Sequence, residues 1–293
     1  MDFEKIREIK ELVISGIYSD DYLLDKLVMK GANVLDLIYN VSPRASMDID
    51  FSIEQSLSGD EFKKLNSSLE EALRTSFSNK GYYLFDYKFS KRPKKAKSNQ
   101  PEFWGGYKVV FKIIPKSELD KTGSDLNRLR REATIVNSEQ KRTFSIDISK
   151  CEWVLGKEKH MLDGLVISTY SPTMLLCEKI RAICQQMSEY SEFVPNPTRS
   201  ARARDFFDIY NICHNFKIDI SSIEFRTQLK SIFAAKKVPL SLTNHIEAYR
   251  EFHRPDFQRV VDTVKPGIVI QDYDAYFDFV SDLFEQLKTP GIK

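Results

Sequence analysis

The sequence is poor in the residues that build disulfide frameworks and zinc sites. It has four cysteines and four histidines among 293 residues. No two cysteines form a C-x-x-C pair and none has a zinc-like spacing to a histidine; they are Cys151, Cys177, Cys184 and Cys213. We therefore expect free, mostly buried thiols in a reducing cytosol.

Long apolar runs are also missing. No stretch approaches the roughly 20 apolar residues that a membrane-spanning helix needs. The N-terminal segment MDFEKIREIKELV is charged and helical in pattern, which is unlike a signal peptide. We expect a cytoplasmic protein with no membrane partner. The formal charge is only +2, so the overall charge says little about partners.

The chain does have enough apolar mass for one large domain or two ordinary ones. Residues 3–29 and 59–77 show helical spacing, and the alternating segments 47–53, 82–89, 106–114 and 144–148 predict strands. Beyond Ser171-Pro172, strand signals nearly vanish and helical patterns follow at about 172–187, 199–213, 221–235, 240–252, 256–264 and 272–287. We predict an α+β fold, with a short mixed sheet in a domain over residues 1–168 and a helical bundle over residues 169–293.

The most informative segment reads RASMDIDF. On a strand, residues two apart point to the same face, so Asp48 and Asp50 project side by side, with Ser46 on the same side. Two adjacent carboxylates repel each other unless a cation lies between them. Mg²⁺ prefers such hard oxygen ligands and usually keeps phosphate and water as its other ligands. Two such ions, about 3.5–4 Å apart, can hold the attacking and leaving oxygens of a displacement at phosphorus.

An alternative remains open, because a D-x-D pair on a strand also occurs on an ordinary solvated face. Two further features favour chemistry. Lys30-Gly31 interrupts two apolar segments, and a glycine turn at a helix start offers backbone N–H groups to a phosphate. Asp147 lies on a separate alternating strand and is a candidate third carboxylate, positioned to accept the proton of an attacking hydroxyl.

The second informative feature of the sequence is a cluster of basic residues. Residues 91–97 carry five Lys or Arg side chains in seven positions, and Pro93 indicates a loop. Such a loop is either solvated or in contact with a polyanion, since Lys and Arg neutralise phosphates and release counterions. If the acceptor is RNA, we expect its backbone to lie here. Trp104 follows the loop and can stack on a base or pack in the core.

These motifs, in this order, resemble the AbiEii/AbiGii family of nucleotidyltransferase toxins, within the DNA polymerase beta-like superfamily. Its first motifs read roughly K-G-G-T-x-L and R-x-S-x-D-[IL]-D-[FL], which match the residues around Lys30-Gly31 and Asp48–Asp50. Glu178-Lys179 resembles the family's E-K-x-x-A motif. Arg204-Asp205, with Asp208, resembles its R-D-x-x-D-[IL] motif. The resemblance covers about residues 25–215.

The resemblance implies a polymerase beta-like fold and Mg²⁺-dependent transfer of NMP from NTP, with the tRNA 3′ end as the expected acceptor. It implies a toxin of a toxin–antitoxin or phage-defence system, with a cognate antitoxin as partner. The implied metal ligands are Asp48, Asp50 and Asp147, and Lys179 and Asp205 are further implied catalytic residues. The implied phosphate-binding residues are Lys30, Gly31, Arg44, Ser46 and Lys179.

Some positions leave alternatives open. From spacing alone, Lys179 and the pair Asp205 and Asp208 also fit a solvated helix surface, and Asp208 can anchor its helix by pairing with Arg202 or Arg204. Ala32 and Asn33 replace the family's second glycine and threonine. These departures motivate a non-catalytic nucleotide- or RNA-binding module as one alternative. Nucleotidylation of a protein or small molecule is the other.

Overall fold

The computed structural model describes residues 3–41, 44, 48–94, 101–122, 125–136, 140–265 and 267–288. The helices of the first half are α1 (Phe3–Tyr18), α2 (Asp21–Lys26), α3 (Ala32–Leu37), α4 (Gly59–Asn79), α5 (Lys116–Thr122) and α6 (Leu126–Glu132). The strands are β1 (Val28–Lys30), β2 (Ile49–Ser52), β3 (Tyr82–Arg92), β4 (Gly106–Pro115), β5 (Phe144–Ser149), β6 (Lys157–Leu162) and β7 (Leu165–Tyr170).

The strands form one seven-stranded mixed sheet in the order β3-β4-β5-β2-β1-β7-β6. Strand β2 pairs with β5 in parallel and β1 pairs with β7 in parallel, whereas the other pairs are antiparallel. The predicted mixed sheet is therefore confirmed, with more strands than the alternating segments indicated.

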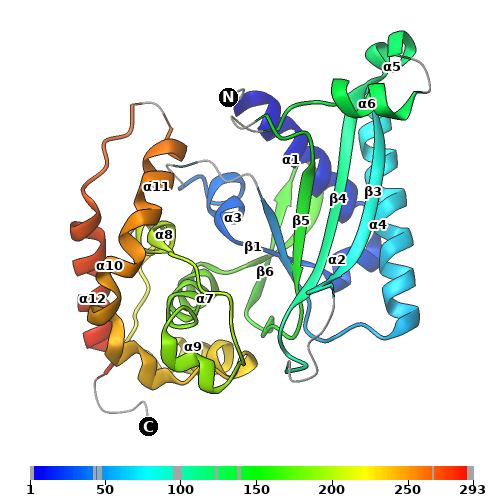
Figure 1. Cartoon of the computed structure of the whole chain (residues 1–293). Helices are drawn as coiled ribbons and strands as arrows, with labels where there is room; N and C mark the ends of the chain where they lie inside the picture. The colour runs from blue at the N-terminus through cyan, green and yellow to red at the C-terminus, as the bar shows by residue number, and fades with distance from the viewer. Residues whose placement is uncertain are drawn as a thin grey trace.

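One face of the sheet is covered by helices from the N-terminal half, of which α1 and α4 pack against each other (Figure 1). Helix α4 begins with a capping box in which Ser58 and Glu61 satisfy each other's backbone N–H groups. Its residues Leu65, Leu69 and Leu73 are buried at helical spacing. The apolar residues of the central strands point into this core. Since successive side chains of a strand point to opposite faces, the residues between them point to the other face of the sheet.

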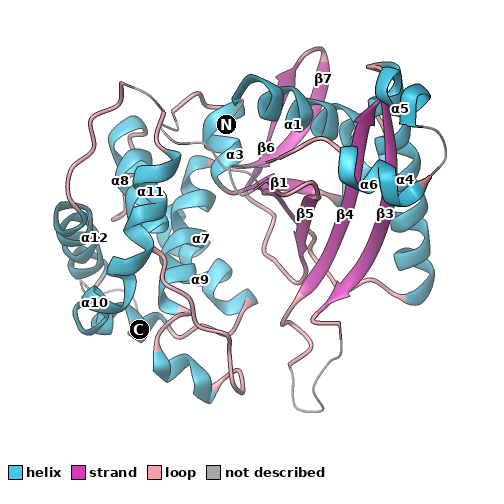
Figure 2. Ribbon diagram, turned by 45° about the horizontal axis from the view of Figure 1, so that its top comes forward, coloured by secondary structure: helices cyan, strands magenta, loops and turns pink. Residues whose placement is uncertain are grey.

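The chain beyond Ser171 is helical and lies beside the sheet (Figure 2); we call residues 172–288 the helical half. Its α-helices are α7 (Pro172–Cys184), α8 (Ala203–Asn215), α9 (Ile223–Ala235), α10 (Arg250–His253), α11 (Phe257–Thr263) and α12 (Tyr273–Leu287). Short 3₁₀ helices occupy Ser188–Glu192, Leu240–Tyr249 and Arg254–Asp256. Ser171 caps α7, and its side chain accepts a hydrogen bond from the backbone N–H of Met174. The change from sheet to helix falls between Tyr170 and Pro172.

Four local predictions differ from the structure. Val28 and Met29, expected at the end of the helical segment 3–29, lie in strand β1. The hairpin of β6 and β7 was not predicted, because β7 is buried along most of its length and β6 is a polar edge strand, so neither alternates clearly. Strand β3 continues through Arg92, so the basic segment begins on a strand rather than in a loop. Residues 240–249 form a 3₁₀ helix instead of an α-helix.

None of the described helices combines the length and apolar character needed to cross a membrane.

Candidate active site

A cavity lies between the sheet and the helical half. Its volume of about 790 Å³ is within the range typical of ligand sites. The sheet side contributes β1, β2, the residues after β5, and the ends of β3 and β4. The helical side contributes α7, the segment that leads to α8 with the first turn of α8, Lys236 directly after α9, and Asp256. Among the described residues, eight cationic side chains line the cavity: Lys30, Arg44, Arg92, Lys179, Arg181, Arg202, Arg204 and Lys236. Six carboxylates of the same described residues join them: Asp48, Asp50, Glu152, Glu178, Asp205 and Asp256.

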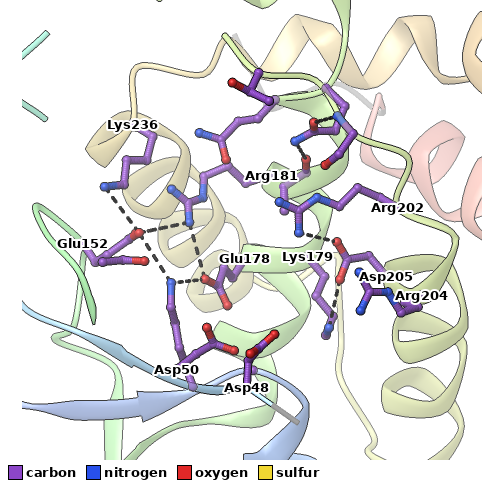
Figure 3. Close-up of a pocket in the computed structure, with 18 of the residues that line it drawn as sticks. Asp48, Asp50, Glu152, Glu178, Lys179, Arg181, Arg202, Arg204, Asp205 and Lys236 are labelled. Carbon is purple, nitrogen blue, oxygen red and sulfur yellow. Dashed lines mark hydrogen bonds and ion pairs between the residues drawn. The ribbon is translucent and has the colours of Figure 1, made fainter. Parts of the chain in front are cut away.

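Asp48 and Asp50 both line this cavity, as the alternation along the strand predicts. Figure 3 shows them together, below Glu178 and Lys179 in that view. Burial raises the pKa of Asp50 to about 7; Lys30 opposes this shift, and the charges of Asp147 and Asp48 add to it. A second cation, in addition to Lys30, would reduce this cost by favouring the ionised form.

Asp147 lies directly beside Asp50, because the two residues are register partners on the parallel strands β5 and β2. Its carboxylate accepts a hydrogen bond from Lys108 Nζ at 2.9 Å, and Asp147 is not among the described residues that line the cavity. Within the described part of the chain, no three acidic, histidine or cysteine side chains are grouped closely enough to hold a metal ion. The fit to Mg²⁺ therefore rests on Asp48 and Asp50, with phosphate and water as the other ligands.

The turn after β1 places backbone next to these carboxylates. Gly31 has φ 78°, and a Cβ built there would lie 2.9 Å from Asp50 Oδ2, so glycine is required on both grounds. The departure at Asn33 has a structural role: its Nδ2 donates to the backbone oxygen of Asp48 at 2.5 Å. Asn33 thus fixes the backbone that carries the first carboxylate.

One wall of the cavity is a buried charge network that we call the Glu152 cluster: Lys30, Glu152, Glu178, Arg181 and Lys236. Lys30 Nζ lies 2.5 Å from Glu178 Oε1 and 3.6 Å from Glu152 Oε1. Burial acts to lower the pKa of Lys30, but Glu178 and Glu152 outweigh it and raise that pKa. Lys30 is therefore a cation held by carboxylates beside the cavity.

The other wall is a second network, the Asp208 cluster: Arg44, Lys179, Arg202, Asp205 and Asp208. Arg44 donates twice to Asp208, at 2.8 and 2.6 Å. Lys179 Nζ donates to Asp208 at 2.6 Å and to Asp205 at 3.1 Å. The partners expected for Asp208 were therefore wrong: Arg202 pairs with Asp205 instead.

The members of the Asp208 cluster differ in their access to the cavity. Lys179 and Asp205 line the cavity. Burial acts to raise the pKa of Asp205, but Lys179 and Arg202 outweigh it and bring that pKa to about 2. Asp208 is 1% exposed and is not among the described residues that line the cavity. Its geometry fits an anchor that joins Arg44 to α7 and α8.

Sequence reasoning missed Glu152, Arg181 and Lys236. A signal existed for Arg181, because Glu178, Arg181 and Gln185 are spaced to share one polar face of α7, and all line the cavity. No local signal marks Lys236, which follows the last residue of α9 and reaches the cavity only through the tertiary fold.

Two predicted parts of the site lie outside the described residues: Ser46 and residues 95–97. Lys91 and Lys94 are exposed, and Arg92 lines the cavity. Trp104 also lines it and packs at 6.2 Å between ring centroids against Tyr190. The basic segment therefore borders the cavity.

Comparison with known proteins identifies the family of the chain. The model of the family "Nucleotidyl transferase AbiEii toxin, Type IV TA system" matches residues 13–279. None of the curated proteins compared matches the sequence.

Among solved structures, a putative nucleotidyltransferase from Helicobacter pylori is 15% identical, with a TM-score of 0.50, covering 98% of this chain and 97% of its own. JHP933 from Helicobacter pylori is 14% identical, with a TM-score of 0.49, covering 97% and 90%. At these identities the likeness concerns the fold. The match of the family model over most of the chain shows that the protein belongs to the AbiEii nucleotidyl transferase toxin family.

Proposed function

We propose that this protein transfers NMP from an NTP to an acceptor and releases pyrophosphate, with the tRNA 3′ end as the expected acceptor. The observation that carries this proposal is the arrangement of Asp48 and Asp50. Asp50 on β2 and Asp48, which directly precedes β2, line a cavity whose facing walls are rich in Lys and Arg. A solvated outer face, which was the competing interpretation of the D-x-D pair, would not have such a cavity beside it.

The donor set at Asp48 and Asp50 fits Mg²⁺, which prefers carboxylate oxygen and retains phosphate and water. When bound, the metal would neutralise charge on the phosphate oxygens. Asp147 is the third acid of the proposal, and in the described arrangement it is held by Lys108. Its proposed role is to accept the proton of the attacking hydroxyl, which requires that contact to loosen.

The phosphates are proposed to lie between the two clusters. Lys30 and Lys179 are buried cations on opposite walls, and both line the cavity. Gly31 leaves room beside Asp50 for close approach of a ligand to the backbone. Arg44 contributes indirectly, because its guanidinium is held by Asp208; Ser46 stays a prediction. Catalysis in such a site is mostly positioning and charge neutralisation.

Family membership supports two further parts of the proposal. A Type IV toxin–antitoxin family suggests a cognate antitoxin as partner. We propose that the protein acts in the cytoplasm, where NTP and tRNA are present, and that its activity serves phage defence or a related toxin function.

Labelled nucleotide tests the proposal directly. Each α-labelled NTP is incubated with the protein, Mg²⁺ and total RNA, and the label is followed into RNA, protein and small molecules. Label in RNA supports the proposal. Label in protein or in a small molecule would move the acceptor to that class. NTP binding without any transfer would indicate the non-catalytic binding module.

The exposed basic residues test the acceptor. Replacing Lys91, Arg92 and Lys94 with glutamine is expected to weaken transfer to RNA about tenfold or more at physiological salt, because each phosphate contact releases counterions. The change should shrink as salt is raised. The matched control replaces three exposed lysines elsewhere, Lys63, Lys80 and Lys157. Equal effects of the two triple variants would remove the basic segment from the acceptor site.

Gly31→Ala separates strain from contact with Asp50. Gly31 and Gly81 have nearly the same φ, 78° and 79°, but a Cβ at Gly81 meets nothing within 4 Å. Both alanine variants should lose about 1 kcal/mol of stability through the positive φ. Only Gly31→Ala should also lose transfer activity, by about tenfold or more, because it displaces Asp50. Parallel urea unfolding and rate measurements distinguish the two, and equal activity would argue against a close approach at Gly31.

A further inference from the structure

Lys236 fastens the helical half to the strand side of the cavity. It follows α9, yet its Nζ donates to the backbone oxygen of Phe103 at 3.1 Å and to that of Lys150. It also lies 3.4 Å from Glu152 Oε1. The side chain is 6% exposed, so these three contacts are made away from bulk water, where charged hydrogen bonds are strong.

The Glu152 carboxylate forms ion pairs with cations from three parts of the fold. The backbone N–H of Glu152 donates to the oxygen of Ile53, which fixes it to the sheet. Its carboxylate lies 3.6 Å from Lys30 on β1, 3.2 Å from Arg181 on α7 and 3.4 Å from Lys236 after α9. Figure 3 shows the carboxylate between the Lys236 amine and the Arg181 guanidinium. Removing its charge would leave three buried cations with Glu178 as their remaining carboxylate in the cluster.

The position of the Arg181 guanidinium depends on the Glu152 and Glu178 carboxylates. Its Nη2 contacts Glu152 and Glu178, whereas its Nε and Nη1 are buried without a partner among the described residues. Lys30 depends on these carboxylates too, and Lys30 is the register partner of Asp50. A contact path therefore runs from Lys236 through Glu152 to Lys30, and from there to the proposed metal ligand.

We propose that Lys236 and Glu152 are a positioning pair, which holds Lys30 and Arg181 in place for the triphosphate and couples the helical half to that binding wall. The inference rests on the proposed function and adds two residues to it. Neither of the pair needs to touch the reacting atoms.

The test compares Lys236→Met, Lys236→Arg and Glu152→Gln with the wild type, and measures kcat and KM for the preferred NTP. Lys236→Met and Glu152→Gln are expected to raise KM about 10- to 100-fold, with a smaller change in kcat, because supporting contacts of bound groups have effects of this size. Lys236→Arg should recover most of the loss. The matched control is Lys237→Met, an exposed neighbour outside the cavity lining, which should leave KM unchanged.

A pH profile gives a readout that a merely structural role would not move. Burial lowers the pKa of Lys236 to about 8, with Glu152 and Cys151 opposing the shift and Arg181 and Lys30 adding to it. Above that pH the amine becomes neutral and its attraction to Glu152 weakens. The KM of the wild type should therefore rise above about pH 8, whereas that of Lys236→Arg should stay flat, because arginine remains charged.

The outcomes separate this inference from the proposed function. Absence of transfer by the wild type would overturn both. Transfer by the wild type with an unchanged KM in folded Lys236→Met and Glu152→Gln would overturn the positioning pair alone. If both variants fail to fold, the wild-type and Lys236→Arg pH profiles still decide, and coincident profiles would reject the inference.

Discussion

Asp50→Asn is expected to reduce nucleotide transfer about a thousandfold while leaving the fold intact. Asparagine keeps the shape of the side chain but removes one of the two charges proposed to hold Mg²⁺. Metal stabilisation of the transition state contributes several kcal/mol, and each 1.36 kcal/mol is a factor of ten in rate. Single-turnover rates with α-labelled NTP give the comparison.

Asp50→Asn should lower the transfer activity but raise the stability of the fold, because the pKa of Asp50 is raised on folding. A carboxyl group whose pKa rises from 3.8 in the unfolded chain to about 7 in the fold destabilises the fold as the pH rises between these two values. In metal-free buffer at neutral pH, Asp50→Asn should therefore be as stable as the wild type or more so. Asp60→Asn is the matched control, since the Asp60 side chain is 99% exposed. A variant that loses activity only in proportion to lost folding would contradict a direct role for Asp50.

Asp208→Asn should have the largest effect on stability, about 3 to 5 kcal/mol, because it removes the carboxylate charge that two buried cations share. Asp208 accepts hydrogen bonds from both Arg44 and Lys179. Its side chain is 2% exposed, so solvent screens the loss very little. Urea unfolding followed by circular dichroism measures the change.

The pH dependence of stability gives an independent check on the same cluster. Burial acts to raise the pKa of Asp208, but Arg44 and Lys179 outweigh it and lower that pKa below the ordinary 3.8. The stability that Asp208 contributes is therefore complete at neutral pH and is lost as the pH falls below about 4. Asp208→Asn should flatten this acid limb, whereas the exposed control Asp60→Asn should leave it unchanged. A loss below about 1 kcal/mol at neutral pH would mean that the pair behaves like a surface ion pair.

The sequence was most informative where the placement of a side chain follows from the two-residue period of a strand. The two-residue spacing of Asp48 and Asp50 on a strand predicts a shared face, and the structure places both on the cavity. Asp147 was predicted on its own alternating strand, but its register beside Asp50 and its contact with Lys108 depend on strand order. Strand order is a tertiary property that no local pattern encodes.

The partners of buried charges were the least predictable feature. Spacing suggested that Asp208 pairs within its own helix, yet its partners are Arg44 and Lys179, which are 164 and 29 residues away. Asn33 looked like a weakened family motif, whereas its side chain fastens the backbone of Asp48. Both outcomes follow from burial: a buried polar group takes whichever partner the fold brings near.

The measurement that tests the central claim most directly is the fate of two labels on one NTP, with and without Mg²⁺. The account predicts that the α-phosphate label appears in the acceptor and that the γ-phosphate label appears in pyrophosphate, in both cases only with the metal present. A γ-label in the acceptor, or transfer at the same rate without a divalent cation, would contradict it.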